Sequence, residues 1–182
     1  MLKRGFMETG KRGSIGADVA ATGGCALSRG NLRYRFGGNL HRDFHASILD
    51  GYNYVKDNFG MDAAREVIGN MARGVHRQMH EKLKAGDASE LVEYWRYYMA
   101  REGDGDCFAL AETPDGDVVL DVKSCPARAH LAKRGVSGGE GLCELTRLFN
   151  EELVKDTPFT LDTAVAADGS CRQTLRRKGG AA

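Results

Sequence analysis

The spacing of apolar residues changes once along this chain, and that change limits which folds it can adopt. Between residues 41 and 99, apolar side chains recur every three or four positions, as in Phe44, Ile48 and Tyr52. This is the period of a helix with one buried face. From residue 108 onward the period becomes two over short segments, which indicates half-buried strands. Helices followed by strands predict an α+β fold.

Turn and cap residues define the expected elements. We expect three N-terminal helices and then a small antiparallel sheet made of two hairpins, with two short helices inserted between the hairpins. The expected helices cover about residues 41–60, 62–84 and 87–99, the hairpins cover 108–122 and 159–175, and the inserted helices start near Pro126 and Cys143.

The first 39 residues are rich in glycine and small residues, and they lack a sustained period. They resemble a twin-arginine export signal that ends in a lipoprotein-like cysteine. Lys3-Arg4 replaces the arginine pair, however, and Asp18 interrupts the apolar centre. We therefore expect a flexible leader with a degenerate export signal over 1–39, a folded domain over 40–178 and a tail over 179–182. A cytoplasmic location is favoured, and twin-arginine-like export stays open.

Composition excludes several classes of partner. The chain of 182 residues carries 26 basic and 25 acidic side chains, so its net charge of +1 gives no reason to expect nucleic acid or an anionic membrane. No stretch approaches the roughly 20 apolar residues of a membrane-spanning helix. Five cysteines without a C-x2-C spacing indicate neither a zinc ribbon nor a full disulfide framework. We expect a small-molecule partner, and a homo-oligomer stays open.

Three cysteines lie where predicted elements begin. Cys125 precedes Pro126, a helix-start residue, Cys143 opens the next helical pattern, and Cys171 starts the last strand. A thiol at a helix N-terminus faces the positive end of the dipole, which lowers its pKa and favours the thiolate. The alternative for each is a buried cysteine that only fills space.

Histidines and glycines supply weaker candidates. His41 and His45, like His76 and His80, have the spacing that puts two imidazoles on one helix face, where they could hold a metal. The alternative is a pair at the edge of the core, and His76 is retained because its helix could bring it to the cysteines. The glycine-rich loop over residues 137–141 could bind an anion through backbone N–H groups, or it could simply connect two elements.

With these residues in view, the chain resembles the L-2-amino-thiazoline-4-carboxylic acid hydrolase family over about residues 41–177. The resemblance rests on the helical first half and on three motifs in order, which are Lys123-Ser124-Cys125-Pro126, Gly141-Leu142-Cys143-Glu144 and Ala167-Asp168-Gly169-Ser170-Cys171.

The resemblance implies a hydrolase without a cofactor that opens a small cyclic amidine carboxylate to a carbamoyl amino acid. Cys143 is the first choice for a nucleophile, with Cys125 next and Cys171 nearby. In a second mechanism a cysteine places a water that Glu144 or His76 activates. The substrate carboxylate would bind the side chains of Arg128 and Arg172 and the backbone at Gly139 and Gly141. The alternative for the two arginines is that they are simply solvated.

A rival reading assigns the same cysteines, with Cys107 or His76, to a metal or an iron–sulfur cluster in a redox or sensory module. The cysteines occur singly and not in pairs, which is unusual for such sites. A third reading is a ligand-binding domain that keeps a pocket without catalysis.

Overall fold

The computed structural model describes residues 44–103 and 105–179. The predicted leader, His41 and the last three residues lie outside the described part. The described elements are α1 (Phe44–Asn70), a π-helical turn (Met71–Val75), α2 (Arg77–Lys84), α3 (Ser89–Glu102), a 3-10 turn (Gly105–Cys107), β1 (Phe108–Glu112), β2 (Val118–Val122), α4 (Pro126–Lys133), α5 (Gly139–Leu153), β3 (Phe159–Val165) and β4 (Cys171–Arg177).

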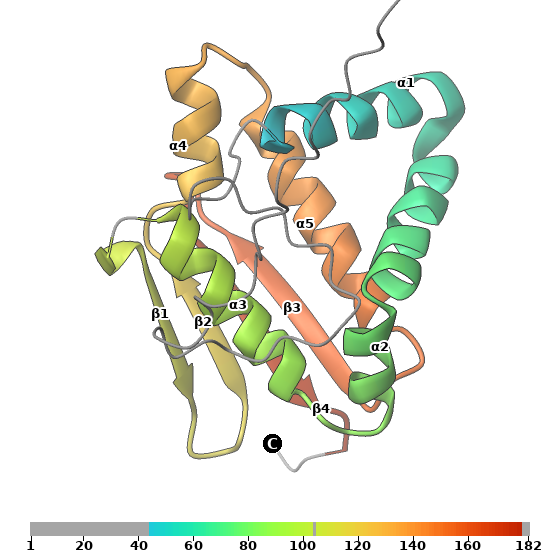
Figure 1. Cartoon of the computed structure of the whole chain (residues 1–182), viewed down its shortest axis with the longest axis vertical. Helices are drawn as coiled ribbons and strands as arrows, with labels where there is room; N and C mark the ends of the chain where they lie inside the picture. The colour runs from blue at the N-terminus through green and yellow to red at the C-terminus, as the bar shows by residue number, and fades with distance from the viewer. Residues whose placement is uncertain (1–43, 104, 180–182) are drawn as a thin grey trace, which may run out of the picture.

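The strands form one antiparallel sheet in the order β1-β2-β4-β3. Each predicted hairpin is present, and pairing of β2 with β4 joins the two hairpins into one sheet. Helices α3 and α5 lie over the same face of this sheet, and α1 runs alongside α5 (Figure 1). The predicted α+β fold, with α4 and α5 inserted between the hairpins, is confirmed.

The main core lies between the helices and the sheet. The alternation predicted for β2 is confirmed, because Leu120 and Val122 point inward and are buried. The main core also contains buried side chains from two helices, α3 and α5, and from the strands β3 and β4. These are Leu91, Trp95, Leu153, Phe159, Leu161 and Leu175. Two smaller clusters pack α1 against α5 and α4.

The second predicted helix is interrupted. Its first part continues α1 beyond a kink at Gly60, whose φ of 87° suits glycine. The π-helical turn then inserts an extra residue, with the His76 N–H bonded to the Met71 carbonyl at 3.2 Å. The inserted residue rotates the following side chains around the helix. Within this turn Val75 is 48% exposed, and Ala72 is buried.

Within the described ranges, no helix is both long enough and apolar enough to cross a membrane. The third helix begins near its predicted cap, since the Ser89 N–H donates to the Asp87 carboxylate at 2.9 Å. This hydrogen bond satisfies one of the N–H groups that a helix start leaves without a partner.

Candidate functional site

Cys125 occupies the N-cap position of α4, with Pro126 as the first helical residue, as the sequence predicted. Its side chain forms no capping hydrogen bond. Burial raises the pKa of the Cys125 thiol, and this effect outweighs the backbone N–H groups of Arg128 and Ala127, which lower it. The prediction of a depressed pKa at this helix start is therefore wrong, because the core packed around the sulfur excludes water from it.

Cys171 comes to the same region from β4. Its partner in the sheet is Val122, and Val122 precedes Cys125 by three positions in the chain. Both thiols pack against the main core. Burial first, and then the neighbouring Cys125, raise the pKa of Cys171 to about 11. Cys143 contributes to the raised pKa of both thiols, so the three predicted cysteines do converge. All three are free thiols and half-buried.

The expectation that Cys143 opens a helix is wrong. Helix α5 begins at Gly139, after Gly138 in the left-handed conformation, which places Cys143 in the second turn. Its thiol lies 3.9 Å from the Gly139 carbonyl and donates to it. The dipole argument that favoured Cys143 as a nucleophile applies only within the first turn of a helix.

Glu144 faces α1. Its carboxylate accepts a hydrogen bond from the Lys56 ammonium at 2.9 Å, and this bond is the main reason that its pKa is lowered. Burial, followed by the nearby Glu144 carboxylate, raises the pKa of Tyr52 to about 12. Glu144 therefore joins α1 to α5 and is a poor general acid.

His76 lies in an aromatic cluster. Its ring meets Tyr94 and Phe149 edge to face, with centroids 5.5 and 5.1 Å away. Burial lowers the pKa of His76, and its Nδ1 has no hydrogen-bond partner among the described residues. Phe149 lies about 9 Å further along α5 than Cys143. The ring contacts of His76 are with these two aromatic side chains, and its approach to the thiols stays a prediction.

The two arginines expected to bind substrate are engaged within the protein. Arg172 donates to both oxygens of Asp121 on the neighbouring strand, at 3.2 and 2.6 Å. Arg128 lies 3.5 Å from the Glu140 carboxylate, and its guanidinium packs so closely on Gly169 that a Cβ there would come within 2.4 Å. Arg128 therefore joins α4 to the start of α5 and to the β3–β4 turn.

The glycines at the start of α5 also have packing roles. A Cβ at Gly141 would lie 2.7 Å from Leu49 Cδ1, so glycine here allows α1 and α5 to approach closely. A Cβ at Gly139 would lie 3.5 Å from the Arg128 side chain, which is an ordinary contact. Both are partly buried, and the predicted carboxylate-binding role of their backbone remains a prediction.

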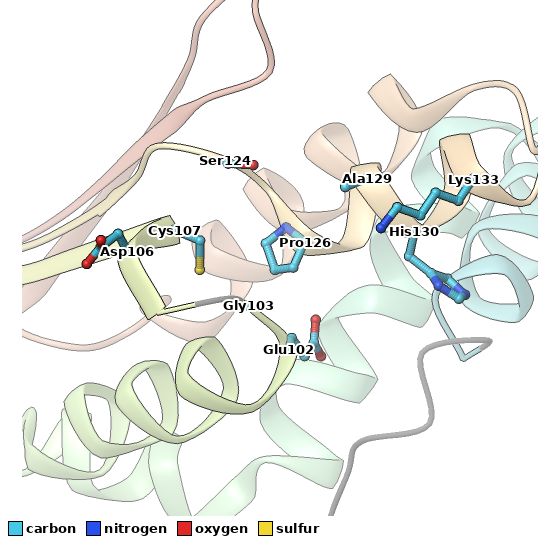
Figure 2. Close-up of a pocket in the computed structure, with 9 residues that line it drawn as sticks. All are labelled: Glu102, Gly103, Asp106, Cys107, Ser124, Pro126, Ala129, His130 and Lys133. Carbon is cyan, nitrogen blue, oxygen red and sulfur yellow. The ribbon is translucent and has the colours of Figure 1, made fainter.

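A pocket of about 290 Å³ opens beside Cys125, between the end of α3, the turn before β1 and α4 (Figure 2). Ser124 and Pro126, which flank Cys125 in the chain, line it. The remaining lining residues are Glu102, Gly103, Asp106, Cys107, Ala129, His130 and Lys133. A second hollow of about 320 Å³ at the end of the sheet includes Cys171, Arg172 and Asp121.

Glu102 is the functional candidate that the sequence did not indicate. Its carboxylate accepts a hydrogen bond from His45 Nε2 at 2.8 Å, and the two side chains are only 13% and 20% exposed. The Glu102 charge also contributes, after burial and Cys143, to the raised pKa of Cys125. A glutamate at the end of an amphipathic helix has no local signature, whereas the spacing of the histidine from His41 makes it a candidate in the sequence.

Among residues 44–103 and 105–179, no three His, Cys, Asp or Glu side chains form a group that could hold a metal ion. Comparison with known proteins found no matching family model, no matching curated protein and no matching solved structure.

Proposed function

We propose that this protein is a small-molecule hydrolase that opens a cyclic amidine carboxylate of the amino-thiazoline type to a carbamoyl amino acid. The observation that carries the proposal is the position of Cys125, which is the N-cap residue of α4, stands between two pocket-lining residues in the chain, and is close enough to Glu102 for that charge to raise its pKa. Glu102 supplies a carboxylate base on the pocket wall, and the proposed nucleophile is the residue between two lining residues, with its thiol packed against the main core. The resemblance of the cysteine motifs supplies the substrate class.

Cys125 replaces Cys143 as the proposed nucleophile. The backbone N–H groups of Ala127 and Arg128 favour its thiolate, whereas the Cys143 thiol donates to a carbonyl of its own helix. The raised pKa of Cys125 means that the resting thiol keeps its proton, so attack requires a base. Glu102, held in place by His45, is the proposed base.

The proposed reaction consumes one water and changes no oxidation state. Glu102 takes the thiol proton, Cys125 Sγ bonds to the ring carbon between nitrogen and sulfur, and the ring nitrogen takes up a proton. The bond from that carbon to the ring sulfur breaks, and the departing sulfur is protonated. Water then adds to the same carbon, the bond to Cys125 breaks, and an N-carbamoyl cysteine is released.

The test is incubation of the protein with 2-amino-thiazoline-4-carboxylate, followed by mass spectrometry for the addition of one water and by thiol titration. We expect turnover from the natural chain, none from Cys125→Ala, and retained turnover from Cys143→Ala, a matched control at a neighbouring half-buried thiol. Glu102→Gln lowers kcat by about 10²–10⁴-fold, the usual contribution of a general base. An inactive natural chain refutes the reaction, and an active Cys125→Ala variant refutes the nucleophile.

A further inference from the structure

The pocket beside Cys125 has side chains of opposite charge on its two sides. Glu102 lies at the end of α3, while Lys133 belongs to α4. Figure 2 shows the Glu102 carboxylate directed toward Pro126, and the Lys133 side chain running back along α4 with its amino group toward the same proline. In that view the Asp106 carboxylate points away from both. A ligand in this pocket therefore lies between a carboxylate and an ammonium group.

Lys133 differs from the two arginines that the sequence suggested. Arg172 already binds Asp121, Arg128 lies against Glu140 and Gly169, and neither lines this pocket. Lys133 lines the pocket, and within the described ranges no carboxylate lies at ion-pair distance from its amino group. An ammonium group on a pocket wall without an internal counter-ion is suited to an anionic part of a ligand.

The size of the pocket limits the ligand. At about 290 Å³ it lies at the lower end of the range for ligand pockets, roughly 300–1,000 Å³. A molecule of amino-acid size fits this volume, whereas a nucleotide needs more room. The two charged walls then require one positive and one negative group within a short molecule.

We infer that Lys133 is the specificity-determining residue of this pocket and binds the carboxylate of an amino-acid-like ligand, whose cationic amidine end faces Glu102. The inference deepens the proposed function and rests on it for the identity of the ligand. It also assigns each end of the substrate to one wall. The amidine carbon then lies on the Glu102 side, next to the residues that flank Cys125.

The test compares 2-amino-thiazoline-4-carboxylate with the corresponding carboxamide, which keeps the amidine and lacks the negative charge. Binding is measured by calorimetry on the full chain with Cys125→Ala, which prevents turnover. We expect this protein to prefer the carboxylate by about 10- to 100-fold, the usual effect of one hydrogen bond to a charged group. Adding Lys133→Met removes the preference, and Lys133→Arg keeps most of it because the positive charge remains.

Lys123→Met is the matched control, since Lys123 is an exposed lysine that does not line the pocket. It keeps the preference of the parent protein. An equal preference in the Lys133→Met and Lys123→Met proteins overturns the role of Lys133 and leaves the proposed reaction standing. If the preference for the carboxylate depends on Lys133 but the natural chain shows no turnover, the binding role of Lys133 is upheld and the proposed reaction is refuted. If neither ligand binds, the role of Lys133 and the proposed reaction are both overturned.

Discussion

Replacement of Gly141 by alanine tests whether the glycines at the start of α5 serve helix packing. In a helix interior, alanine is normally more favourable than glycine by about 0.8–1.0 kcal/mol. At Gly141 the new methyl group would lie 2.7 Å from Leu49 Cδ1, and Leu49 is only 1% exposed. Overpacking of this kind costs about 1–3 kcal/mol. The sum predicts a change between no effect and a loss of about 2 kcal/mol in the free energy of unfolding.

Gly139→Ala is the control, because its Cβ would make only an ordinary contact of 3.5 Å with Arg128. We expect Gly139→Ala to match or slightly exceed the natural protein, so the two variants should differ by about 1–3 kcal/mol. Urea titrations measure both free energies by linear extrapolation, with an unchanged m value as the check on two-state unfolding. The packing explanation fails if Gly141→Ala is as stable as Gly139→Ala.

Three further changes probe other parts of the fold. Burial lowers the pKa of His76 below 6.5, so the unfolded chain takes up a proton first, and the free energy of unfolding falls as the pH decreases from about 6.5. His76→Phe should reduce this pH dependence in urea titrations at pH 7 and 5. An unchanged pH dependence would contradict the assignment to His76. Asn150→Ala removes the 2.7 Å hydrogen bond to buried Gln173 and should cost about 1–3 kcal/mol of unfolding free energy in the same assay. Arg172→Ala breaks an exposed pair with Asp121, so its thermal unfolding should report a loss of at most about 1 kcal/mol.

The elements that the sequence predicted well are those with local signals. Proline at the first position of α4 fixes its backbone angle for a helix start, and Asp168-Gly169 supplies a turn with a φ of 84° at the glycine. Alternation in the strands selects which side chains face the core, which is why Leu120 and Leu175 are buried. In each case the residues that carry the information lie within a few positions of the feature.

The missed features depend on packing between distant segments. His45 and Glu102 are 57 positions apart, and nothing near either residue predicts the other. The π-helical turn likewise has no local signature, yet it turns Val75 toward solvent. The engagement of Arg128 with the β3–β4 turn needs the spatial position of Gly169. A sequence pattern predicts which face of its own helix or strand a side chain lies on, but the residue that it contacts on another element depends on the fold.

The pKa of Cys125 brings these two kinds of information together. The local argument, a thiol at a helix start, predicts a lowered pKa, whereas burial by distant elements raises it above the usual 9.0. Alkylation of Cys125 by iodoacetamide, followed by peptide mapping, should therefore still accelerate above pH 9 in the free protein. An alkylation rate that levels off below pH 8 would show that the helix start lowers the pKa of Cys125 by more than burial raises it. With the raised pKa, a cationic amidine in the pocket would favour the thiolate, so the nucleophile would form mainly when substrate is bound.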